Sequence, residues 1–81
     1  MLVRVRLSAG LTPSGGNSRL SVSLEENATI ADLLEYLHNE YPALASKINT
    51  ALPMISGRPV APAHHLSEAE EVALLLPAAG G

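Results

Sequence analysis

Hydrophobic and polar residues alternate in two segments near the start of the chain. In residues 2–7, three apolar side chains share one face, and Arg4 and Arg6 share the other. Residues 19–24 repeat this period of two, which predicts half-buried strands. The stretch between them, residues 8–17, has the Pro, Gly, Ser and Asn content of a loop, so the two strands are expected to form an antiparallel hairpin.

The hydrophobic period becomes that of a helix after Thr29. Five residues recur at helical spacing and are expected to share one buried face: Ile30, Leu33, Leu34, Leu37 and Tyr41. Thr29 is a suitable N-cap, and Asp32 three positions later can satisfy a first-turn amide. Pro42 disfavours helical geometry in the residue before it, so the helix is expected to end near Tyr41.

Shorter elements fill the rest of the chain. Residues 43–50 suggest a short helical turn and residues 52–55 a short strand, while residues 56–59 have the composition of a turn. Leu66 is expected to fill the core before a final strand over residues 71–76. The fold class is therefore α+β: a mixed sheet with one main amphipathic helix packed on one face.

Composition narrows the possible functions. The 81 residues fit one domain, and the absence of cysteine excludes disulfides and thiol catalysis. A net charge of −3 without a basic stripe argues against nucleic acid and anionic membranes as partners. We expect a cytoplasmic protein. The lone pair His64 and His65, in an irregular stretch of a chain without cysteine, is weak evidence for a metal, and its role stays open.

The end of the chain carries the most specific chemical signal. An apolar run stops at Pro77, and only small residues follow: Ala78, Ala79, Gly80 and Gly81. A terminus this thin can enter a narrow channel and present its own carboxylate to another enzyme. We therefore divide the chain into a folded domain, residues 1–77, and a flexible C-terminal tail, residues 78–81.

At this point the chain resembles a known family. The order of elements is similar to the ubiquitin-like β-grasp fold, and in particular to the MoaD/ThiS-like sulfur carriers, of which the molybdopterin synthase small subunit is the nearest. Residues 66–81 carry the most specific likeness: a Leu, an acidic turn and a Glu-Val pair lead through apolar residues and proline to Gly-Gly. Residues 55–60 resemble the family's short strand and turn, where an Asn usually precedes the Gly.

The resemblance implies a carrier rather than a stand-alone enzyme. A ubiquitin-activating-type adenylyltransferase would use ATP to adenylate the Gly81 carboxylate, and a sulfur donor protein would convert it to a thiocarboxylate. The acceptor would be the large subunit of molybdopterin synthase, in a heterotetramer, for molybdenum cofactor biosynthesis. No cofactor or metal would be bound by this chain. Gly80 removes a Cβ that would obstruct the partner's channel, while Pro77, Ala78 and Ala79 would contact the partner.

Leu75 is the candidate docking anchor on the folded domain, because it lies on the sheet face without the helix and next to the tail. Arg4 and Arg6 on the same face could add electrostatic complementarity. Other functions share these features: a ubiquitin-like modifier joined to target lysines through Gly81, a sulfur carrier for thiamine or tRNA thiolation, or a non-covalent interaction module. Lys47 is the only lysine, so self-conjugation could use only Lys47 or the Met1 amine.

Overall fold

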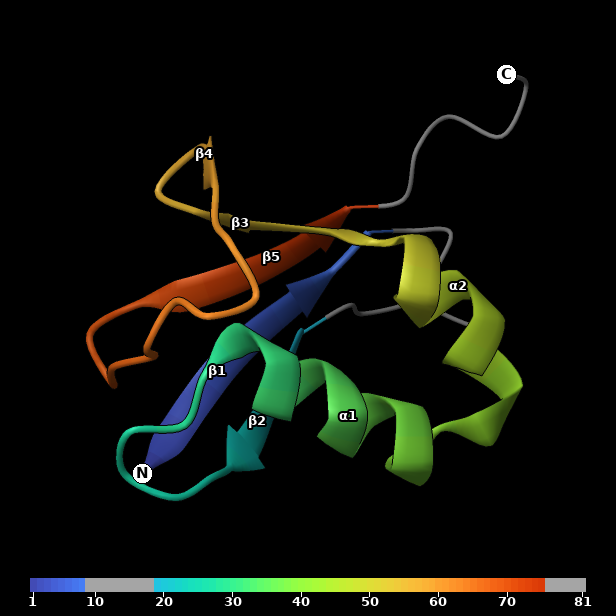
Figure 1. Ribbon diagram of the computed structural model, residues 1–81, viewed down its shortest axis with the longest axis horizontal. Coiled ribbons are helices and arrows are strands. Elements are labelled where there is room, and N and C mark those ends of the chain that lie inside the picture. Colours follow the sequence, from blue (N-terminus) through green and yellow to red (C-terminus); the bar gives the residue numbers. More distant parts are fainter. Residues whose placement is uncertain (9–18, 76–81) are drawn as a thin grey trace.

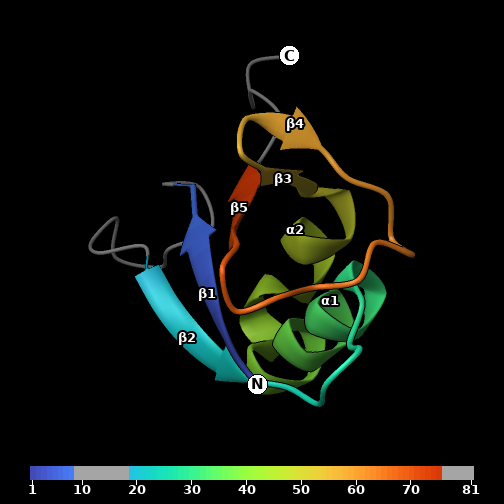
Figure 2. The same ribbon diagram turned by 90° about the vertical axis from the view of Figure 1, so that its left-hand side faces the viewer.

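The computed structural model describes residues 1–8 and 19–75, which form a five-stranded mixed sheet with two helices on one face (Figures 1 and 2). The strand order is β2-β1-β5-β3-β4, in which β1 and β5 are parallel and the other neighbours antiparallel. The elements in chain order are β1 (Leu2–Leu7), β2 (Arg19–Ser23), α1 (Ile30–Glu40), the 3-10 turn η2 (Pro42–Leu44), α2 (Ala45–Thr50), β3 (Leu52–Ile55), β4 (Arg58–Pro59) and β5 (Glu71–Leu75).

The core lies between α1 and the covered face of the sheet. The alternation in β1 sends Val3, Val5 and Leu7 inward, as the period of two predicts, and all three are buried. From β5, Val72 and Leu74 are fully buried in the same cluster. The remaining buried members come from β2, α1, η2, α2, β3 and the segment before β5: Val22, Ile30, Leu33, Leu37, Leu44, Ile48, Ile55 and Leu66.

Helix α1 starts where the sequence predicts. The Thr29 hydroxyl accepts a hydrogen bond from the Asp32 amide at 3.3 Å, and the Asp32 carboxylate accepts one from the Thr29 amide at 2.9 Å. This reciprocal pair is a capping box and satisfies two amides at the helix start. The helix ends at Glu40 with Tyr41 as its C-cap, next to Pro42, which confirms the predicted end.

The segment between β4 and β5 crosses the start of α1 and holds it against the sheet. The amides of Ile30 and Ala31 donate to the carbonyls of His64 and Pro62, each at 3.0 Å, and the Leu66 amide donates to the Ala28 carbonyl at 2.8 Å. The first two bonds use the remaining free amides at the helix start, and the third ties Leu66 to the residue before the N-cap. They also explain why Leu66, in an irregular stretch, is buried as expected.

Two details differ from the sequence-based expectation. Tyr41 is 43% exposed, because its backbone has left helical geometry at the cap and no longer continues the buried face. Arg58 and Pro59, expected within a turn, instead form β4, which pairs with Ile55 and Met54 of β3. The turn itself is shorter than expected and ends at Gly57.

Candidate functional site

The candidate site lies on the sheet face that no helix covers. Cross-strand pairing places the side chains of this face in rows across the sheet. One row joins Arg19, Arg6, Ala73 and Met54, and the next row toward the end of β5 contains Leu75 opposite Leu52. The face therefore combines arginines on β1 and β2 and Glu71 on β5 with apolar residues on β5 and β3.

Leu75 and Leu52 form an exposed apolar pair where β5 ends. They are direct partners across the β5–β3 ladder, with 37% and 46% of their surfaces exposed. Their chain neighbours Leu74 and Pro53 are buried on the opposite face of the sheet, so the pair lies on strands that the core holds in place. The structure thus places Leu75 on the open face, as the sequence predicts, and adds Leu52, which sequence reasoning missed.

A hollow of about 360 Å³ lies beside this leucine pair. Ala73 contributes to its lining between Arg6 and Met54, and its small side chain lets the surface sink there. Leu75 lines one side, and the Ser56–Gly57 turn another. The hollow is partly open to solvent, so its shape suits a side chain inserted from a partner rather than an enclosed small molecule.

Arginines border the apolar residues on the β1 side. Arg6 and Arg19 are direct cross-strand partners, and like charges at such positions destabilise a sheet. Among residues 1–8 and 19–75, neither Arg4 nor Arg6 forms an ion pair. Arg4 is the register partner of Glu71 on β5, so the arginines of this face have an acidic residue of the same chain beside them.

A larger hollow of about 570 Å³ lies elsewhere, between α1 and residues 24–28. Its lining includes Glu25, Glu35 and Tyr36. Leu24 at its edge is hydrogen-bonded to Met1, so this hollow sits at the opposite end of β1 from Leu75. It is separate from the candidate site.

The proposed reactive end lies outside the described residues. This applies to Pro77, Ala78, Ala79, Gly80 and Gly81, to the predicted last position of the final strand, Leu76, and to the division between residues 77 and 78. The structure shows only the residue that precedes this segment: Leu75, the last residue of β5.

The histidine pair does not form a metal centre with neighbouring residues. His65 Nδ1 donates to the Asn27 carbonyl at 2.9 Å, and His64 Nε2 lies 3.5 Å from a Glu70 carboxylate oxygen. Within the described part of the chain, no group of three or more His, Cys, Asp or Glu residues is arranged to hold a metal ion. The His65 side chain therefore links the segment before β5 to the loop before α1, whereas the contact of His64 with Glu70 lies within that segment.

Comparison with protein-family models identifies the chain. The model of the ThiS family matches residues 5–81, nearly the whole sequence. The chain belongs to the ThiS family. The match begins within β1, includes all of β5 and continues to Gly81. A search of curated proteins finds no significant match.

Solved structures agree with this assignment. SAMP1 from Haloferax volcanii superposes with a TM-score of 0.83 at 25% identity, with both chains covered completely. A complex of subunits 1 and 2 of molybdopterin-converting factor from Helicobacter pylori gives a TM-score of 0.71 at 16% identity, again over 100% of both chains. A ubiquitin from Caldiarchaeum subterraneum gives 0.65 at 18% identity and covers 100% of this chain and 98% of that one.

These likenesses confirm the ubiquitin-like β-grasp fold predicted from the sequence. As a ThiS family member, the protein is of the sulfur-carrier or ubiquitin-like modifier type. Proteins of this type are small carriers and not catalysts themselves. Among the described residues, no helix is long and apolar enough to cross a membrane.

Proposed function

We propose that this ThiS family protein is a sulfur carrier whose Gly81 carboxylate is adenylated and then converted to a thiocarboxylate. The observation that carries the proposal is the family match through Gly81, on a domain whose last strand ends at an exposed leucine pair. A carboxylate is a poor electrophile, and adenylation gives it a leaving group that sulfur can displace. The chain has no cysteine, so a thiocarboxylate would be its means of carrying reactive sulfur.

The activating partner would be an adenylyltransferase of the ubiquitin-activating type that uses ATP. We propose that it docks on the Leu75–Leu52 pair and inserts a side chain into the hollow above Ala73. Exposed apolar patches rimmed by polar residues mark sites of protein interaction. Acidic groups on its rim would face Arg6 and Arg4. The short residues of the tail would then pass into its active site, with Gly80 leaving clearance around Gly81.

The sulfur acceptor would be the large subunit of a molybdopterin synthase, with a heterotetramer as the expected assembly. Support comes from the fold likeness to subunit 1 of the Helicobacter pylori molybdopterin-converting factor, a chain that was solved in complex with subunit 2. The same activated tail would serve thiamine or tRNA thiolation, so the acceptor depends on which partner surface recognises the open sheet face.

A second function, attachment to other proteins, is favoured by one specific comparison. The SAMP1 chain matches at 25% identity over the full length of both proteins, and a second Haloferax volcanii structure of 24% identity is described as small archaeal modifier protein 1. In this function the activated Gly81 would react with a lysine amine instead of sulfur.

Intact-mass measurement separates these functions. The protein is incubated with an activating enzyme, ATP and a sulfur donor, with and without added target proteins. Exchange of one oxygen for sulfur supports the carrier, and covalent adducts to targets support the modifier. If ATP causes no change in mass and deletion of Gly81 has no effect on the host cell, the protein is neither, and a non-covalent interaction module remains.

A further inference from the structure

Strand β2 forms one edge of the sheet, and no other described strand lies along its outer side (Figure 2). On its inner side, Leu24 and Met1 exchange two hydrogen bonds of 2.8 Å at the end of the β1–β2 ladder. Bonded and non-bonded pairs alternate in an antiparallel ladder, so Val22 is the next residue bonded to β1. The backbone N–H and C=O groups of Ser21 and Ser23 therefore point away from the sheet, where a further strand can bind them.

The two edges of the described sheet differ in how they are protected. At the other edge, β4 has only two residues, and one of them, Pro59, has no N–H to donate. Natural edge strands are often short or interrupted by proline or a bulge, because an open edge invites pairing with another chain. In contrast, β2 has five residues without proline, and its register with β1 runs unbroken from Arg19 to Ser23. The β2 edge is thus the one that is open to strand addition.

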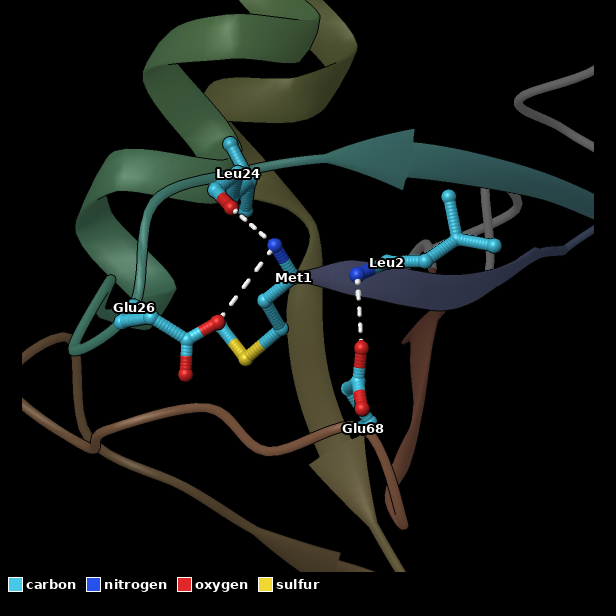
Figure 3. A network of polar contacts seen from close by, with 5 residues as sticks. All are labelled: Met1, Leu2, Leu24, Glu26 and Glu68. Carbon is cyan, nitrogen blue, oxygen red and sulfur yellow. Dashed lines mark hydrogen bonds and ion pairs between the residues drawn. The ribbon is translucent and has the colours of Figure 1, made fainter.

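The end of β2 leads into the hollow of about 570 Å³ beside α1. Its lining contains no basic residue and has four carboxylates: Glu25, Glu26, Asp32 and Glu35. Two of them are engaged, since Glu26 lies 3.5 Å from the Met1 amine (Figure 3) and Asp32 accepts a hydrogen bond in the capping box. Neither Glu25 nor Glu35 forms an ion pair with another described residue. Two carboxylates of the hollow are therefore available to a cation from outside.

Helix α1 adds an aromatic ring to the same wall. Its lining residues have the spacing of one helical face: Asp32, Glu35, Tyr36 and Asn39. Tyr36 is exposed there. The flat guanidinium of an arginine can rest on such a ring while neighbouring carboxylates balance its charge. The chemistry of the hollow thus favours a basic side chain over an acidic or apolar one.

We propose that β2 binds an extended segment of a partner protein as a further strand of the sheet, and that basic residues ahead of that segment occupy the hollow. In antiparallel pairing, the commoner arrangement, the start of the added strand lies beside Ser23. Ser23 is followed by Leu24 and Glu25, which line the hollow. A partner with arginines just before a strand-forming segment fits both features, because the backbone bonds and the carboxylates act on adjoining parts of it.

Charge favours a separate partner over a second copy of this chain. The net charge is −3, so two copies repel each other, whereas a basic segment is attracted. The surface is also distinct from the open-face site, because β1 and β5 lie between β2 and β3. Binding at the β2 edge leaves the Leu75–Leu52 pair uncovered and does not depend on activation of Gly81.

The test titrates the isotope-labelled full chain with a synthetic peptide in which two arginines precede alternating threonine and valine. A control peptide carries two glutamates in place of the arginines. The arginine peptide should shift the NMR signals of the Ser21 and Ser23 amides and slow their hydrogen exchange by about fivefold or more. The glutamate peptide should bind about tenfold more weakly. Equal affinities, or no binding at millimolar peptide, would overturn the proposal.

Variants of the chain test the two features separately. Ser21→Pro removes an outward N–H without touching the β1 ladder and should weaken binding by about tenfold. Glu35→Lys should weaken it by about fivefold, whereas Glu40→Lys, an equal change of charge on α1 outside the hollow, should stay within about twofold. Unchanged binding by Ser21→Pro, equal effects of the two lysine variants, or signal shifts confined to residues around Leu75 would contradict the proposal. Protection of the Ser21 amide in a peptide-free dimer, seen by sedimentation, would assign the edge to a second copy instead.

Discussion

Leu75 on β5 and Leu52 on β3 face each other across the sheet, and both are exposed on the side without helices. We predict that Leu75→Glu weakens binding to the activating adenylyltransferase by about tenfold or more, because a charge would be buried at the centre of the interface. The fold should remain near that of the unchanged chain, since the side chain has no place in the core. Titration calorimetry measures the affinity.

Leu2→Glu provides the matched control for this change. Leu2 is 55% exposed and lies on the same face, but at the opposite end of the sheet. Its substitution should leave the affinity for the activating enzyme within about twofold, as for a position outside the interface. Equal loss of affinity in both variants would contradict a docking site at the Leu75 end of the face.

Adjacent leucines should separate folding from docking. Leu74 is fully buried and Leu75 is exposed, because successive side chains of a strand point to opposite faces. Leu74→Ala should lower the free energy of unfolding by about 2–5 kcal/mol, as for other buried leucines. Leu75→Ala should cost under about 1 kcal/mol. Urea denaturation of the two variants measures the difference, and similar costs would contradict the assigned faces.

The position of Arg6 on the open face predicts an effect on association rather than on stability. Arg6→Ser replaces an exposed residue outside the core and should change the free energy of unfolding by less than about 0.5 kcal/mol. The same change should slow association with an acidic partner and reduce its salt dependence. Stopped-flow binding at two ionic strengths tests this; an unchanged salt dependence would exclude Arg6 from the interface.

Most of the fold was predictable because its local signals agree with its packing. Alternation in β1, the helical period from Ile30, and the Thr29–Asp32 pair each correspond to a structural feature of the described chain. These signals are local, and each is reinforced by burial on one face. Leu75 could be placed for the same reason, since a strand's period assigns its side chains to faces.

Some features of the candidate site could not be predicted from the sequence, because they depend on which strands become neighbours. Leu52 became part of the site only through its pairing with Leu75, and Ala73 became the base of a hollow through its position between Arg6 and Met54. Tyr41 shows the reverse: its spacing fits the buried face, but the helix ends before it. Strand β4 was missed because two residues carry too little periodicity to predict pairing.

The Ser56–Gly57 turn offers a prediction about stability alone. Ser56 has a φ of 52° and Gly57 a φ of 78°, the left-handed geometry of the tight turns that favour Asn-Gly. Ser56→Asn should therefore raise the free energy of unfolding by a few tenths of a kcal/mol, and Ser56→Val should lower it by about 1 kcal/mol or more. Thermal denaturation of both variants is the measurement, and the opposite order would contradict the turn geometry.

The central claim is that sulfur is carried on the Gly81 carboxylate, and one measurement tests it most directly. The protein is incubated with the activating enzyme, ATP and sulfur donor, then cleaved after Glu71 to release residues 72–81 for tandem mass spectrometry. The account predicts exchange of one oxygen for sulfur, located on Gly81, and no exchange in a chain that lacks Gly81. Sulfur found elsewhere, or an unaltered peptide from a chain that the enzyme demonstrably binds, would contradict it.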